Sequence, residues 1–234
     1  MQADTIGTME QVTDSFNLKS MQQAMNYNGA ILELLQQRAL QSISILDFGA
    51  GRGGYANQFA QSITCVEPNE TLSRYIASRH TVLSDLWRVR GVFDMVYSIN
   101  VLEHIQYDDD TLQELRSVML KGARLFLFVP ARSEIYTVMD YNVGHYRRYE
   151  PWQLRSLLER TAFNIRSWRY FDFAGYFATL FCKHAGSLIN WQGGLSSCCV
   201  SLYDKCLFPV SRVMDTVTAG KIIGKNIWVE AIAR

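Results

Sequence analysis

The stretch that decides the fold is Ile45-Leu46-Asp47-Phe48-Gly49-Ala50-Gly51-Arg52-Gly53-Gly54. The mostly apolar run over 43–48 predicts a buried strand, and the glycines after it predict a sharp turn that a ligand can approach without a Cβ in the way. Gly49, Gly51 and Gly54 also satisfy the G-x-G-x-x-G fingerprint of dinucleotide-binding turns. The turn therefore predicts a nucleotide-like ligand but leaves its class open.

Asp47 distinguishes between a dinucleotide and S-adenosylmethionine as the ligand of this turn. A carboxylate at the end of the first strand would repel the anionic pyrophosphate of a dinucleotide. The methionine end of S-adenosylmethionine carries an ammonium and a sulfonium, which a nearby carboxylate favours. A purely structural role, in which Asp47 bonds the turn amides, is the alternative interpretation. We take S-adenosylmethionine as the predicted cofactor.

Strand and helix patterns alternate through the first half of the chain. Short apolar runs predict strands, and the segments between them predict helices, which indicates a parallel sheet with helices on both faces. The predicted strands are 43–48, 63–66, 81–83, 93–98 and 123–129, and the predicted helices are 55–61, 72–78 (with Asn69 as its N-cap) and 109–119.

The second half predicts a helix from Pro151 to Glu159, a strand over 163–171 and a closing strand over 226–233. The expected fold is a doubly wound, Rossmann-like α/β domain with seven mainly parallel strands, an antiparallel closing strand and a helical lid insertion. We predict one domain over 1–234. Its expected parts are cofactor-covering helices in 1–40, a cofactor-binding core in 41–170, the lid in 171–225 and the closing strand in 226–234.

Four motifs occur in the order and spacing typical of class I S-adenosylmethionine-dependent methyltransferases, and from about residue 25 onward the chain resembles that family. The resemblance implies an enzyme that transfers a methyl group to a small molecule by in-line displacement, through a branch acting on small molecules or sugar-linked acceptors. It implies a cofactor site made of the first-motif residues Asp47, Gly49, Ala50 and Gly51, the ribose-binding Glu67 with Pro68, the adenine-binding Asp85 with Leu86, Asn100 near the methionine end, and Tyr27 as a cover.

The segment 140–149 follows the fifth strand, where an acceptor would meet the methyl group. His145 has an intrinsic pKa suited to a general base, and His104 is a second candidate. Arg147 and Arg148 could clamp an anionic acceptor with the help of Tyr141, although such residues often only brace a lid. Glu103 is expected to brace the helix after the fourth strand.

Bulk composition narrows the partners. The 23 basic and 22 acidic residues nearly cancel, which argues against a nucleic-acid groove as the main partner. The five irregularly spaced cysteines fit neither a disulfide framework nor a zinc site, so we predict a cytoplasmic protein with no metal.

No run is long enough to span a bilayer, and the aromatic-rich region 171–225 suggests a lid, a homodimer face or a peripheral membrane contact. An NAD-dependent oxidoreductase and a non-catalytic cofactor-binding protein remain the alternative functions.

Overall fold

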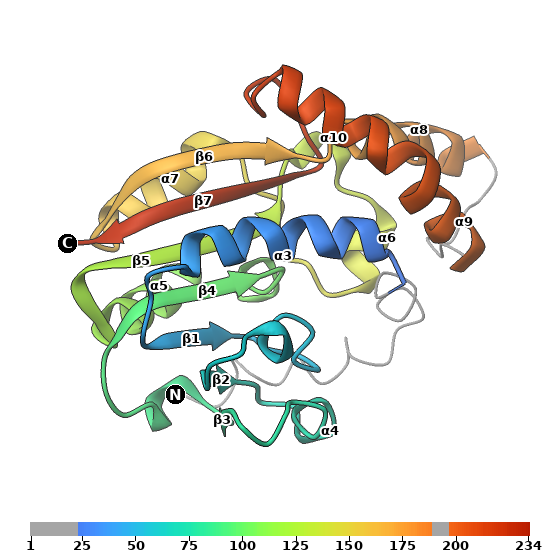
Figure 1. Cartoon of the computed structure of the whole chain (residues 1–234). Helices are drawn as coiled ribbons and strands as arrows, with labels where there is room; N and C mark the ends of the chain where they lie inside the picture. The colour runs from blue at the N-terminus through green and yellow to red at the C-terminus, as the bar shows by residue number, and fades with distance from the viewer. Residues whose placement is uncertain (1–22, 189–196) are drawn as a thin grey trace.

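Seven strands form one sheet in the computed structural model, which describes residues 23–188 and 197–234, and their order is β3-β2-β1-β4-β5-β7-β6 (Figure 1). β1 to β5 run parallel to one another, whereas β7 runs antiparallel to both β5 and β6. This arrangement confirms the predicted fold class. The strands are β1 (Ile45–Phe48), β2 (Thr64–Val66), β3 (Thr81–Leu83), β4 (Phe93–Ile99), β5 (Met119–Pro130), β6 (Phe163–Phe171) and β7 (Asn226–Ala233).

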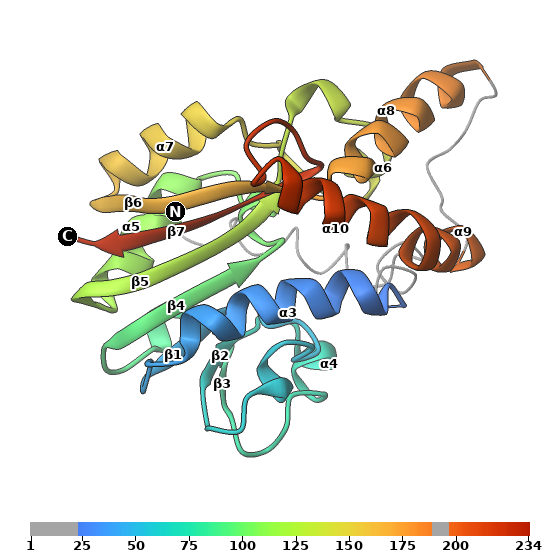
Figure 2. The ribbon, with the colours of Figure 1, turned by 45° about the horizontal axis from the view of Figure 1, so that its top comes forward.

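The central strands are apolar almost throughout because helices cover both faces of the sheet. α3 (Met25–Ala39) lies on one face, and α5 (Asp108–Ser117) and α7 (Pro151–Arg160) lie on the other (Figures 1 and 2). Each face has its own hydrophobic cluster, one built with α3 and the other with α5 and α7. The sheet is thus held rigidly, and the loops at its carboxyl edge have a firm base.

β1 begins two residues later than the sequence predicts. The amides of Ile43 and Ser44 donate to the carboxylate of Asp94, at 2.8 and 3.2 Å, instead of pairing with a neighbouring strand. Ile43 is also exposed to solvent. Apolar character alone therefore extended the predicted strand too far.

Two predicted helices are shorter than expected. The segment predicted as 55–61 contains only the 3₁₀ turn η1 (Ala56–Gln58), and the one predicted as 72–78 is α4 (Glu70–Ser73). Asn69 caps α4 as predicted, through its side-chain oxygen. The carboxamide of Asn57 accepts from the amide of Ala77 at 2.8 Å, so side-chain bonds replace further helical turns here.

The described residues of the region 171–225 are largely helical, as predicted, and the helices project beyond the carboxyl ends of the parallel strands (Figure 2). Buried carboxylates fasten it to the body of the domain. Asp204 accepts from the amides of Asn26 and Tyr27 at 3.0 and 2.9 Å, and so caps the start of α3. Asp215 accepts from the amides that follow β6. The elements are α8 (Phe173–Leu188), α9 (Ser197–Leu202), η5 (Tyr203–Leu207) and α10 (Phe208–Val217).

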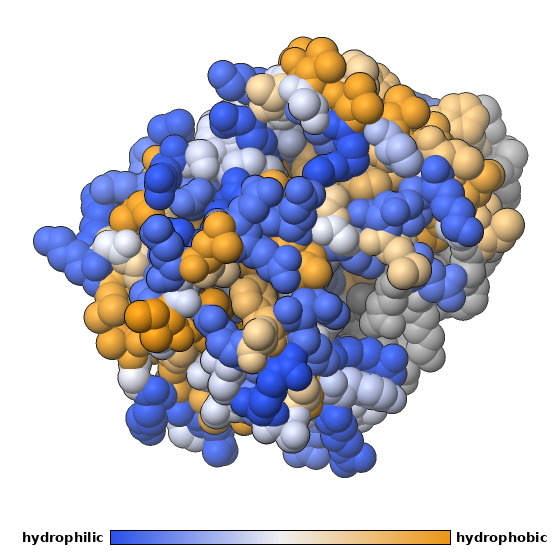
Figure 3. Space-filling view, in the orientation of Figure 1, coloured by the Kyte–Doolittle hydropathy of each residue, from blue (hydrophilic) through white to orange (hydrophobic). Residues whose placement is uncertain are grey.

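Exposed apolar side chains gather over α10 and its neighbours at the top of the molecule in Figure 3. Val210, Val213 and Val217 on α10 are all more than half exposed. Within the described residues, no helix combines the length and the apolar character needed to cross a membrane.

Candidate functional site

The glycine turn after β1 needs its glycines for two different reasons. Gly49 has a φ of 81°, and a Cβ added there would lie 2.4 Å from a methyl carbon of Val101. Gly51 has a φ of 55°, and a Cβ there would meet no atom of the described residues within 4 Å. Gly49 therefore packs against the turn after β4, whereas the space beside Gly51 is open to a ligand.

Glu67 lies at the end of β2 and faces the glycine turn. Its carboxylate accepts from the amide of Gly51 at 2.6 Å and from the amide of Asn69, the residue after Pro68, at 2.8 Å. Burial raises the pKa of Glu67, while these two hydrogen bonds oppose the rise. The carboxylate joins the turn after β1 to the turn after β2, and its remaining lone pairs are available to hydroxyl donors.

Asp47 lies beneath the turn and is almost fully buried. Its carboxylate accepts from the hydroxyl of Tyr97 at 2.8 Å. Burial raises the pKa of Asp47 to about 7, although the Tyr97 hydrogen bond lowers it, and the charge of Glu67 adds to the rise. A cation bound at this edge would favour the ionised form of Asp47.

The next two strands bring the remaining predicted cofactor residues to the same edge. Asp85 follows β3, accepts from the hydroxyl of Ser84 at 2.8 Å and precedes the 3₁₀ turn η2 (Leu86–Arg88), whose first residue is buried. Asn100 follows β4, is exposed and has a φ of 53°, and its amide donates to the carbonyl of Phe128 at 2.8 Å. β1 to β4 are adjacent and parallel, so these residues share one edge with the glycine turn.

Tyr27 is placed differently from its predicted role as a cover over the cofactor. Its hydroxyl donates to the side chain of Asn226 at 3.0 Å, and its ring packs edge-on against Phe128, Phe171 and Phe208. Burial raises the pKa of Tyr27 well above its usual value. The residue is part of the hydrophobic core, so we leave it out of the site.

His145 is oriented by a buried carboxylate. Its Nδ1 lies 2.9 Å from Asp140, the third helical residue of α6 (Val138–Asn142). Burial would raise the pKa of Asp140, but the hydrogen bond from His145 and the charge of Arg148 hold it well below its usual range. An ionised carboxylate can only accept a hydrogen bond, so Nδ1 donates to Asp140, and Nε2 is the ring nitrogen that faces Glu103.

The two arginines are held by the protein itself. Arg148 is buried and lies 2.8 Å from Asp140, and it also donates to the carbonyl of Ala131. Arg147 pairs with Asp108 at 2.8 Å at the start of α5. Both side chains brace the segment after β5 against the core, which was the alternative interpretation. Tyr141, the other predicted acceptor residue, is exposed on α6.

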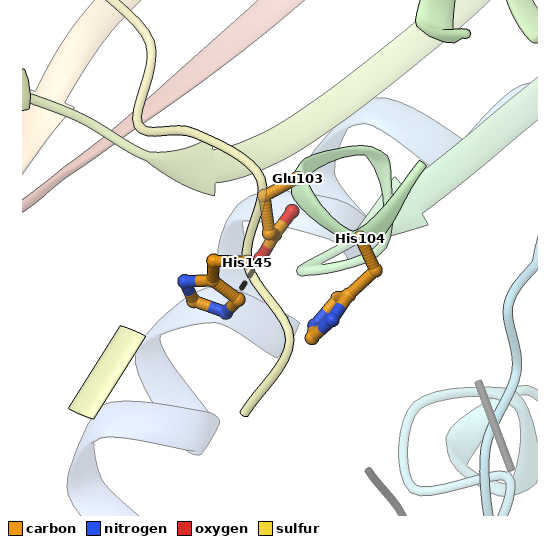
Figure 4. A group of neighbouring side chains, drawn as sticks. All are labelled: Glu103, His104 and His145. Atoms are coloured by element: carbon orange, nitrogen blue, oxygen red, sulfur yellow. Dashed lines mark ion pairs between the residues drawn. The ribbon is translucent and has the colours of Figure 1, made fainter. Parts of the chain in front are cut away.

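Glu103 is the site residue whose position the sequence did not reveal. It belongs to the 3₁₀ turn η3 (Leu102–His104), is fully buried and approaches His145 with its carboxylate, as Figure 4 shows. The distance from its Oε1 to Nε2 of His145 is 3.8 Å. Burial raises the pKa of Glu103 to about 7, with His145 opposing the rise. The only signal in the sequence was its position beside His104 just after a predicted strand end.

His104 completes this group. Its ring lies edge-on to that of His145, with 4.6 Å between ring centroids. Burial and then the charge of His145 lower the pKa of His104 to about 3. The structure therefore brings together both predicted catalytic histidines, together with Glu103, beside the end of β4.

Comparison with known proteins identifies the family. The sequence pattern of the family described as "Methyltransferase domain" matches residues 19–185, which is more than half of the chain. No curated protein matches the chain in sequence.

Solved structures agree with this fold. A SAM-dependent methyltransferase from Thermotoga maritima, described as a possible histamine N-methyltransferase, is 12% identical with a TM-score of 0.63, over 97% of this chain and 100% of that one. Magnesium protoporphyrin IX methyltransferase from Synechocystis with bound SAH is 14% identical with a TM-score of 0.57, over 94% and 88%. Phosphoethanolamine N-methyltransferase 2 of Haemonchus contortus, in complex with S-adenosyl-L-methionine, is 13% identical with a TM-score of 0.61, over 98% and 60%.

The chain has the glycine turn and strand-end acids at one sheet edge, a matching family pattern over most of its length and a shared fold. It belongs to the methyltransferase-domain family, with the class I methyltransferase fold that its motifs predicted.

Proposed function

We propose that this protein transfers a methyl group from S-adenosylmethionine to an oxygen or nitrogen atom of a small molecule. The observation that carries the proposal is the convergence of Gly51, Glu67, Asp85 and Asn100 on one edge of the sheet, with open space beside Gly51. Ligands of doubly wound sheets bind at this edge. The cofactor, when bound, supplies a methyl group on a sulfonium that is already a good leaving group.

Each residue of the proposed cofactor site has a distinct task. Glu67 accepts from the two ribose hydroxyls, and Asp85 accepts from the adenine amino group. The turn residues Gly49 to Gly51 let the cofactor lie against the backbone, and Asn100 lines its methionine end. The cofactors bound in the Synechocystis and Haemonchus contortus enzymes support this choice of ligand.

The acceptor is proposed to lie between the end of β4 and the segment 140–149. Positioning supplies much of the acceleration of an in-line displacement. An acceptor that must lose a proton could give it to Nε2 of His145, the ring nitrogen opposite the one that Asp140 holds. The neighbours named after histamine, protoporphyrin and phosphoethanolamine support a small-molecule acceptor. Tyr141 is the proposed residue for lining it.

His145→Ala tests the base. Loss of a general base should lower kcat by about 10²–10⁴-fold and leave cofactor affinity almost unchanged. If His145 only braces the segment, the variant should instead raise the acceptor KM and lower the melting temperature. A near-normal kcat at saturating acceptor would remove His145 from the catalytic residues.

A second function has one observation in its favour. A cyclase named SpnF shares the fold, with a TM-score of 0.54 and 16% identity over 87% of this chain and 80% of that one. A protein with this fold can therefore be named for a cyclisation and not for methyl transfer. Incubating the protein with pooled metabolites and methyl-labelled S-adenosylmethionine separates the two. Labelled product supports our proposal, whereas cofactor binding without any labelled product across the pool favours the other role.

The exposed apolar side chains of α8 and α10 support a contact through 171–225, with either a second copy or a membrane surface. Light scattering and liposome sedimentation distinguish the two. The cytoplasmic location stays a prediction.

A further inference from the structure

Glu103 raises a question that the proposed function does not answer. Its side chain is fully buried, and neither carboxylate oxygen accepts a hydrogen bond from another described residue. A buried carboxylate without hydrogen bonds is strongly unfavourable unless it is paired or binds a cation. Among the described residues, the group within ion-pair distance of this carboxylate is the imidazole of His145, whose Nε2 lies 3.8 Å from Oε1.

Two further ligand atoms face the same point. Nδ1 of His104 is buried and has no hydrogen-bond partner among the described residues. Nε2 of His145 faces Glu103 at 3.8 Å, and Asp140 holds the other ring nitrogen. The ligand atoms of Glu103, His104 and His145 all lie within 4.8 Å of one another (Figure 4).

We propose that Glu103, His104 and His145 form a binding site for a divalent transition-metal ion, with Zn²⁺ as the preferred ion. Two imidazole nitrogens and one carboxylate, with positions left open, form a recognised ligand set for such ions. Imidazole ligands favour zinc over magnesium, which prefers oxygen. The sequence alone predicted no metal, because Glu103 and His104 lie about forty residues from His145 and the cysteines gave no ligand spacing.

The geometry is close to that of a bound ion. Ligand atoms about 2.0–2.2 Å from zinc stand roughly 3.4 Å apart in a tetrahedral shell. The ligand atoms here lie within 4.8 Å of one another, and Glu103 Oε1 and His145 Nε2 are 3.8 Å apart. Asp140 completes the arrangement, because a carboxylate on the far nitrogen fixes the tautomer and orientation of a ligating histidine. Arg148 in turn pairs with Asp140 at 2.8 Å, which keeps that carboxylate in place.

The site lies beside the place proposed for the acceptor, and this part of the inference rests on the proposed function. An ion there could bind an acceptor hydroxyl oxygen and lower its pKa. The hydroxyl would lose its proton to solvent, the new O–CH₃ bond would form as the S–CH₃ bond breaks, and the thioether product would leave neutral. His145 would then be a ligand and not the base.

Metal binding by the chelator-treated full chain tests the site directly. Calorimetry with ZnCl₂ should show one ion per chain, and CoCl₂ should give visible absorption bands of a ligated ion. Glu103→Gln, His104→Ala and His145→Ala should each weaken zinc binding at least tenfold, and Asp140→Asn should weaken it by about 10–100-fold. MgCl₂ should bind more weakly than either transition metal.

His184→Ala is the matched control, because His184 is an exposed histidine on α8 and does not belong to the group of three ligand residues. Circular dichroism shows which variants fold. If Glu103→Gln does not fold, His104→Ala is used to test the site. No zinc binding by the wild type, or unchanged binding in folded cluster variants, overturns the site. Titration of the same samples with S-adenosylmethionine keeps the claims separate, because cofactor binding without metal binding overturns only this inference.

Discussion

Glu67 is the residue on which cofactor binding should depend most. A carboxylate that accepts from charged or hydroxyl donors contributes about 1–3 kcal/mol, so Glu67→Ala should weaken S-adenosylmethionine binding by about 5- to 150-fold. Calorimetry measures the change. Glu70→Ala is the control, because Glu70 is acidic, nearby and exposed. Equal affinities of wild type and Glu67→Ala for S-adenosylmethionine would mean that Glu67 only stabilises the turns and does not bind the cofactor.

Asp47 should make the stability of the cofactor-free protein depend on pH. An aspartate titrates near 3.9 when unfolded, and burial raises the pKa of Asp47 to about 7. The fold thus favours the protonated form, and the stability this contributes is present below about pH 4 and lost as the pH rises to about 7.

Asp47→Asn removes this titration while keeping an acceptor for Tyr97. We expect the variant to melt at a higher temperature than wild type at pH 8, with a gap that shrinks toward pH 5. Thermal melts across that range measure the gap, and Asp110→Asn, at an exposed position on α5, should follow the wild type. A gap that does not change with pH would contradict the buried titration of Asp47.

The residues that the sequence located well are those tied to strand ends. Asp47, Glu67, Asp85 and Asn100 each follow an apolar run, and parallel strands bring such positions to one edge. Tyr27 could not be located, because an aromatic residue near the N-terminus fits a core and a site equally well. The pairing of Arg148 with Asp140 and the meeting of Glu103 with His145 depend on loops whose paths no local pattern specifies.

At the scale of elements, the turn after β1 and the turn η3 after β4 are packed as one unit through Gly49 and Val101. Gly49→Ala should destabilise the protein by about 2–5 kcal/mol, since a left-handed φ costs roughly 1–2 kcal/mol and overpacking roughly 1–3 kcal/mol. Gly54→Ala should be nearly neutral, because its Cβ would meet nothing within 4 Å. Chemical denaturation measures both.

A double variant separates the cost of the left-handed φ at Gly49 from the cost of overpacking against Val101. Val101→Ala removes the methyl groups that a Cβ at Gly49 would meet, so in the Gly49→Ala background it should recover the overpacking part only. Additive effects of the two substitutions would show that the turns are not packed as one unit.

Element types were easier to predict than element lengths. β6 and β7 begin and end where their patterns predicted. The two strands pair with each other along their whole lengths, so the apolar pattern and the pairing give the same bounds. α4 and η1 stop early because Asn57 bonds the backbone of the neighbouring segment, and β1 starts late because Asp94 captures the amides before it. Long-range side-chain bonds of this kind are invisible to a local pattern.

At the scale of the whole molecule, the strand order places β1 to β3, whose loops form the proposed cofactor site, on one side of β4. The strands β5 to β7, which precede or follow the segments proposed to hold the acceptor, lie on the other side. The first half contributes the glycine turn and the acids. The second half contributes the segment 140–149 and the helices of 171–225, which Asp204 and Asp215 fasten to the domain. Helical content in 171–225 was predictable from its apolar density, but its attachment through buried aspartates was not.

The central claim is that this sheet edge binds S-adenosylmethionine, and calorimetry with the full chain tests it most directly. We expect S-adenosylmethionine and its demethylated product to bind with dissociation constants in the micromolar range, on the order of −8 kcal/mol, and NAD to give no heat of binding. Binding of NAD without binding of S-adenosylmethionine would contradict the account.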